Sequence, residues 1–156
     1  MSAELLREKA PGLIAQLMLA DPRLRVLVYY AAGLSIVRFG VVPVLTQVNR
    51  DRAGTIALHG PNTGISVHEV HPCRGADLRT RGLLDDVQAQ AWEDELDRTV
   101  AYVPEGTEPM HTCATFETQS KALALGRDPS LPPVVPHLHL QVPGVIALYP
   151  RIQLWT

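Results

Sequence analysis

The chain has 156 residues, the size of one typical domain and enough to enclose a single hydrophobic core. Hydrophobic residues make up 46% of the chain and charged residues 19%, which argues against intrinsic disorder. The formal net charge of −2 and the pI near 6.3 provide no strong basic field, so nucleic acid and anionic membranes are not expected as partners.

The N-terminal part, residues 1–40, is expected to be helical. Apolar residues within 2–19 recur at helical spacing, and Pro11-Gly12 is expected to divide this segment into two helical pieces. Asp21 followed by Pro22 is typical of a capped helix start. A second helix is therefore predicted from this point to about Gly33.

The N-terminus and the cysteines indicate the compartment. The segment MSAELLREKAPG contains acidic residues and no uninterrupted apolar core, unlike a secretory signal. The longest apolar stretch, residues 26–37, is too short to span a bilayer. Cys73 and Cys113 are too few for a disulfide framework and lack the spacing of a thiolate zinc site, so both are expected to be free thiols. We expect synthesis in the cytoplasm, without a signal peptide and without membrane insertion.

Residues 41–156 are expected to contain strands, loops and one further helix. Residues 41–48 are rich in β-branched side chains and predict a buried strand, and residues 83–99 have apolar side chains on a helical period. Further short strands are expected at 76–79, 102–103, 112–117 and 137–142, with one or two more within 145–155.

The remaining segments of this part are predicted as connections. Residues 49–72 contain several glycines and prolines and should be mostly loop, while four prolines prevent residues 120–136 from being helical throughout. Helices come first and strands dominate the end, without βαβ alternation. This order predicts an α+β fold in a single domain over 1–156, with N-terminal helices (1–40) and a small antiparallel sheet that carries the site (41–156).

The strand predicted at 137–142 carries two histidines at alternate positions. Side chains alternate between the two faces of a strand, so His137 and His139 share one face while the leucines between and after them point into the core. Gln141 should lie on the same face and hydrogen-bond behind a ligand. Two adjacent imidazoles suit a metal or proton-transfer site. The alternative is the ordinary polar face of an edge strand.

A second polar group precedes and enters the strand predicted at 76–79. His68 and His71 lie in the loop before this strand, and Asp77 lies within it. A buried carboxylate requires a partner, either a cation or one of the arginines Arg50, Arg74 and Arg79.

These motifs resemble the LAS metallopeptidases: lysostaphin-type enzymes, zinc D-Ala-D-Ala peptidases and the hedgehog signalling domain. That family has a motif SxHxxGRAxD followed later by HxH or (E/D)xxH. Here Ser66-Val67-His68, Arg74-Gly75-Ala76-Asp77 and His137-Leu138-His139 are similar to its pieces, and VLTQVNR at 44–50 is similar to the preceding strand and arginine. The similarity spans residues 41–142, about two thirds of the chain. It is strongest with small phage-encoded members of the carboxypeptidase branch.

The resemblance implies a zinc ion (Zn²⁺) bound by His68, Asp77 and His139. The interval from His68 to Asp77 is longer than in the family motif, so His71 is the alternative first ligand. His68 is preferred because Ser66 stands where the motif requires a serine. Three protein ligands are typical of a catalytic zinc site.

The catalytic base is the main departure from the family pattern. Pro136 and Pro133 occupy the two positions where relatives carry the acidic residue. Glu117, at the end of a predicted strand, is the first candidate to replace it, and Glu69 is the second. His137 is expected to transfer a proton or stabilise the oxyanion. Arg50 is expected to hold a peptide carboxylate, or to form a structural ion pair.

The resemblance implies a zinc-dependent peptidase that cleaves peptidoglycan stem peptides, as a D,D-carboxypeptidase or endopeptidase of a phage. Such a protein would reach the cell wall by holin release or as a component of the virion, where other virion or tail proteins would be its partners. The alternative is a non-catalytic structural or interaction protein that retains the peptidase fold and the metal.

Overall fold

The computed structural model describes residues 4–102, 111–142 and 150–152, and among the last strands the side chains of residues 101, 102, 111, 112 and 150–152 are not described. The helices are α1 (Leu13–Leu19), α2 (Pro22–Phe39), α3 (Arg52–His59), α4 (Asp86–Thr99) and α5 (Gln119–Ala124). The strands are β1 (Arg7–Glu8), β2 (Val44–Gln47), β3 (Gly75–Arg79), β4 (Val100–Tyr102), β5 (His111–Thr112), β6 (Ala114–Glu117), β7 (His137–Gln141) and β8 (Pro150–Ile152).

The main sheet has five strands in the order β1-β2-β3-β7-β6. β2, β3, β7 and β6 pair antiparallel, whereas β1 pairs parallel with β2. The predicted α+β class is confirmed, but the sheet is mixed and not purely antiparallel. Three short strands, in the order β5-β4-β8, form a second sheet.

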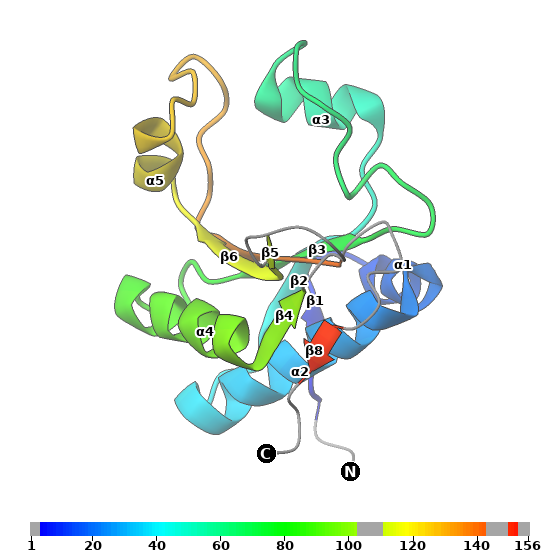
Figure 1. Cartoon of the computed structure of the whole chain (residues 1–156), viewed down its shortest axis with the longest axis vertical. Helices are drawn as coiled ribbons and strands as arrows, with labels where there is room; N and C mark the ends of the chain where they lie inside the picture. Colours follow the sequence, from blue (N-terminus) through cyan, green and yellow to red (C-terminus); the bar gives the residue numbers. More distant parts are fainter. Residues whose placement is uncertain (1–3, 103–110, 143–149, 153–156) are drawn as a thin grey trace.

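The helices lie on both sides of the main sheet (Figure 1). α1, α2 and α4 pack against one face, where the side chains of Leu45, Leu78 and Leu140 are fully buried. α3 and α5 rise from the opposite face on two separate arms. The core therefore occupies one side of the sheet, and the polar side chains of the other face lie between the arms.

Two helices were predicted correctly, one from its capping signal at Asp21-Pro22 and the other from the apolar period over 83–99. The side chain of Asp21 accepts a hydrogen bond from the backbone N–H of Arg23 at the start of α2. α4 starts with a capping box in which Asp85 and Gln88 exchange hydrogen bonds. α2 continues past Gly33, because a single glycine does not stop a helix, and ends at Gly40 with the left-handed φ of +68°.

One local prediction was wrong, and two were incomplete. The first helical piece expected before Pro11 is absent from the described residues, and Arg7–Glu8 forms strand β1 beside β2 instead. The loop expected over 49–72 contains α3, whose cap Asp51 accepts from the N–H of Gly54. The connection over 120–136 begins with the short helix α5. Of the stretch 145–155, only residues 150–152 are described; Val103 and Trp155 also lie outside the described residues.

Two further observations concern the cysteines and the lengths of the helices. Cys73 and Cys113 are buried and unpaired, as predicted. No helix within the described residues combines the length and apolar character that a bilayer crossing requires.

Candidate metal centre

The alternation of side chains along β7 positions the candidate site. Leu138 and Leu140 are fully buried on the helix-covered face, while His137, His139 and Gln141 point to the other face. The antiparallel register of β3 and β7 places Asp77 directly opposite His139. Two residues 62 positions apart thus become neighbours through strand pairing alone.

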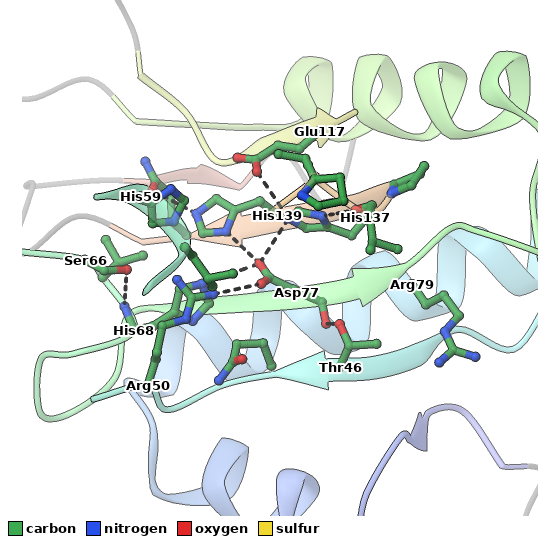
Figure 2. Close-up of a pocket in the computed structure, with 18 of the residues that line it drawn as sticks. Thr46, Arg50, His59, Ser66, His68, Asp77, Arg79, Glu117, His137 and His139 are labelled. Carbon is green, nitrogen blue, oxygen red and sulfur yellow. Dashed lines mark hydrogen bonds and ion pairs between the residues drawn. The ribbon is translucent and has the colours of Figure 1, made fainter. Parts of the chain in front are cut away.

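Three side chains form a His-Asp-His cluster, consisting of His68, Asp77 and His139 (Figure 2). Nδ1 of His139 lies 2.8 Å from Oδ1 of Asp77, and Nε2 of His68 lies 3.4 Å from the same oxygen. The three donor atoms all lie within 4.8 Å of one another. His68 and Asp77 are buried and His139 is partly buried. The cluster could therefore hold a metal ion.

The loop that carries His68 is held against the sheet by close backbone contacts. The hydroxyl of Ser66 accepts from the N–H of His68, and the N–H of Arg50 donates to the carbonyl of His68. A Cβ at Gly75 would lie 2.4 Å from Cγ2 of Val67 and 3.3 Å from Cε1 of His68, so only glycine permits this approach. His71, the alternative ligand, is exposed and outside the cluster.

The hydrogen bonds behind the two histidines suit metal ligands. Nδ1 of His68 lies 2.6 Å from the carbonyl oxygen of Val48, which can only accept, so this nitrogen carries a proton and Nε2 faces Asp77. Nε2 of His139 lies 3.2 Å from Oε1 of Gln141, which leaves Nδ1 directed at Asp77. Imidazoles that bind metals are commonly oriented by such an oxygen acceptor on their second nitrogen. The donor set thus fits a divalent ion of the zinc type.

The electrostatics of the cluster favour positive charge beside Asp77. Burial alone would raise the pKa of Asp77, but hydrogen bonds from His139 and His68 outweigh it and hold the pKa well below its usual range. Burial would likewise lower the pKa of His68, but Asp77 raises it to about 9. Protons and a metal ion would compete for the same nitrogen atoms.

A second acid-base pair lies beside the cluster. β6 pairs with β7 so that Glu117 stands opposite His137, and Oε2 of Glu117 lies 3.2 Å from Nε2 of His137. The same nitrogen lies 3.8 Å from Oδ1 of Asp77, while Nδ1 of His137 bonds to the carbonyl of Val135 at 2.7 Å. Burial opposes protonation of His137, but Glu117 and the charge of Asp77 raise its pKa to about 9. The expectation that Glu117 lies beside the histidine strand is confirmed.

The two remaining candidates have different surroundings. Nη2 of Arg50 lies 3.7 Å from Oδ2 of Asp77, so Arg50 forms the expected ion pair and also lines the pocket. Glu69 instead accepts from the N–H of Ser66 and lies 3.3 Å from Nη1 of Arg52. Glu69 is therefore held by Arg52 and Ser66 and does not line the pocket.

The cluster forms part of the floor of a pocket of about 590 Å³. Its walls come from the end of α3 and from the segment 133–136 that follows α5. His59, which no sequence motif singled out, ends α3 and lines this wall, with Nδ1 3.3 Å from Nη1 of Arg127. Arg127 joins the two arms by donating to the carbonyls of Leu58 and Pro132. The aspartate cap at Asp51 was the sequence signal for α3, and the nearby glycines obscured it.

Comparisons with known proteins returned no match to a protein-family model, to a curated protein or to a solved structure.

Proposed function

We propose that the chain is a zinc-dependent peptidase acting on peptidoglycan stem peptides, as a D,D-carboxypeptidase or endopeptidase. The observation that carries this proposal is the convergence of His68, Asp77 and His139 beside the His137–Glu117 pair in one pocket. His68, Asp77 and His139 are the residues that the motif resemblance selects as ligands, and they come from three separate segments of the chain.

His68, Asp77 and His139 would hold the zinc ion. Two imidazole nitrogens and one carboxylate oxygen are a common ligand set of catalytic zinc sites. Zinc bound there would supply Lewis-acid polarisation of the scissile carbonyl and of the attacking water. Gln141 and the carbonyl of Val48 keep both imidazoles oriented.

Glu117 is the proposed general base in place of the acid that the prolines displace. Its carboxylate lines the pocket, one imidazole away from Asp77. Glu117 takes a proton from water as the water oxygen bonds to the carbonyl carbon, and the proton passes to the leaving nitrogen as the C–N bond breaks. Once Glu117 is protonated and neutral, His137 turns its Nε2–H from Glu117 to the developing oxyanion, while its Nδ1 stays bonded to Val135. The pair returns to its starting state after each turnover.

Arg50 is proposed to bind the terminal carboxylate of the peptide. Its guanidinium borders both the cluster and the pocket, and its Nε is buried without a hydrogen-bond partner among the described residues. An arginine fork is well matched to a carboxylate. The resemblance is the ground for peptidoglycan as the substrate. It is also the ground for access to the cell wall either by release through a holin or as a virion component beside tail proteins.

The competing function is a non-catalytic structural or interaction protein that keeps the fold and the metal. The observation in its favour is that Pro133 and Pro136, at the family's base positions, form part of the pocket wall. Turnover by the purified protein separates the two functions.

The test uses zinc-loaded protein and purified peptidoglycan, with released amino groups and D-alanine as readouts. Glu117→Gln should lower kcat by about 10²–10⁴-fold, because it removes the base but keeps the shape, while zinc content stays unchanged. Glu95→Gln is the matched control, since Glu95 lies on α4 and pairs with Arg38 away from the pocket. Activity retained in Glu117→Gln would refute the assigned base, and a zinc-loaded wild type without turnover would favour the non-catalytic protein.

A further inference from the structure

The charged side chains that line the pocket differ in whether they have a hydrogen-bond or ion-pair partner. The pocket is lined by four lysine and arginine side chains, those of Lys9, Arg50, Arg79 and Arg127. Arg50 pairs with Asp77, and Arg127 donates to two backbone carbonyls. Glu117, the other pocket acid, pairs with His137. Lys9 and Arg79 have no side-chain hydrogen bond or ion pair among the described residues, so they leave the pocket with unneutralised positive charge.

Strand geometry directs Arg79 into the pocket. Asp77 and Arg79 occupy alternate positions of β3 and therefore share a face. Arg79 stands opposite His137 on β7 and opposite Val44 on β2. Two residues along a strand span about 7 Å, which is within the reach of an arginine side chain from the cluster. Lys9 follows β1 and donates its backbone N–H to Leu45 of β2. The parallel register places it one residue past the Glu8–Leu45 pair, toward the Asp77 end of the pocket and away from Arg79.

Arg50 and Arg79 lie on opposite sides of Asp77 (Figure 2). β2 and β3 run antiparallel, with Gln47 beside Asp77 and Val44 beside Arg79, so Arg50, which follows β2, lies toward the start of β3. A peptide whose terminal carboxylate meets Arg50 and whose scissile carbonyl lies over the cluster extends its acyl side toward Arg79. An extended peptide advances about 3.5 Å per residue, so Arg79 meets the second or third acyl-side residue.

We infer that Arg79 is a subsite for a second carboxylate, located on the acyl side of the cleaved bond. The substrate class is then a peptide with two carboxylates, one terminal and one within about three residues before the scissile bond. Arginine binds such a group through two parallel hydrogen bonds. This inference rests on the proposed peptidase function, because the position of the scissile bond sets the direction of the peptide.

The probes are two synthetic stem peptides of the sequence L-Ala-γ-D-Glu-meso-diaminopimelyl-D-Ala-D-Ala. One has free acyl-side carboxylates, and the other has both as carboxamides, so they differ in charge but hardly in shape. Wild type should cleave the free acid with a kcat/KM about tenfold higher than the diamide, since a charge-assisted hydrogen bond is lost in the diamide. Arg79→Gln should reduce this ratio to below about twofold. Arg81→Gln, an exposed arginine outside the pocket, should leave the ratio unchanged.

Measurement of peptide binding distinguishes a failure of the proposed Arg79 subsite from a failure of the proposed peptidase activity. Calorimetric titration in the Glu117→Gln background should give a Kd about tenfold lower for the free acid, and the added Arg79→Gln should abolish that preference. If neither peptide is cleaved but the Arg79-dependent preference in binding is present, the subsite stands and the peptidase proposal falls. Equal cleavage of both peptides by wild type overturns the subsite and leaves the peptidase intact. Equal binding of both, or binding of neither, also overturns the subsite.

Discussion

Replacement of Asp77 by asparagine tests the metal centre most directly. Oδ1 of Asp77 lies within 3.4 Å of nitrogen atoms from both His68 and His139, and the carboxylate is buried. Asparagine has nearly the same shape but carries no charge, so it removes the anionic ligand without opening a cavity. Loss of an outer hydrogen-bond partner typically lowers metal affinity 10–100-fold, and loss of a direct anionic ligand should lower it by at least about 100-fold.

The expected effect on stability follows from linkage between binding and folding. At a free zinc concentration 100 times the Kd, the wild type gains about 2.7 kcal/mol of unfolding free energy. For a chain of this length, that gain raises Tm by about 5–11 °C. At the same zinc concentration the variant, with a Kd at least 100-fold higher, gains no more than about 0.4 kcal/mol, or about 1–2 °C.

Differential scanning calorimetry with and without zinc measures both shifts, and elemental analysis measures the bound metal. The comparison is made within each protein, so any change in the stability of the zinc-free variant cancels. His71→Ala is the control, because His71 is exposed and outside the cluster. Zinc binding at the His-Asp-His cluster would be refuted if Asp77→Asn kept the full zinc-induced rise in Tm, or if zinc did not raise the Tm of the wild type.

Two further predictions concern residues of helix α4. Burial, and then the charge of Glu93, raise the pKa of Asp97 to about 6, above its unfolded value. The folded chain therefore holds an extra proton between roughly pH 4 and 6, and the unfolding free energy falls as pH rises through this window. Asp97→Asn should thus raise the unfolding free energy by about 1–2 kcal/mol at pH 8 and by nearly nothing at pH 4, as urea titrations at both pH values would measure; an equal change at both would contradict the assignment. Trp92→Phe should lower the unfolding free energy by about 1–3 kcal/mol, because the Trp92 indole is buried and donates to the carbonyl of Ala31; unchanged thermal unfolding would show that this bond contributes nothing.

The local signals in the sequence predicted most of the elements that carry the site. The alternation around His137 and His139 marked β7, the Asp21-Pro22 cap marked the start of α2, and the apolar period over 83–99 marked α4. These signals work because capping and alternation depend on neighbours within a few residues.

The sequence missed two kinds of segment: those in which tertiary contacts outweigh local preference, and short helices whose local signals are weak. Arg7–Glu8 lies in an apolar pattern of helical spacing, but pairing with β2 makes it a strand. α3 and α5 are short and glycine- or proline-flanked, so their local signals are weak. The prediction of a purely antiparallel sheet failed for the same reason, since the parallel pairing of β1 depends on where the chain returns.

The residue types, their spacing and their order were enough to nominate His68, Asp77 and His139 and to place two of them on strands. Only the tertiary structure decided between His68 and His71, because that choice depends on the contact between Val67 and Gly75, which holds the loop against β3. The tertiary structure also brought Glu117 to His137, through the register of β6 with β7, and placed Glu69 outside the pocket in an ion pair with Arg52. The physical reason is that alternation fixes the face on which a strand residue points, whereas its partner depends on strand pairings and loop contacts between distant segments.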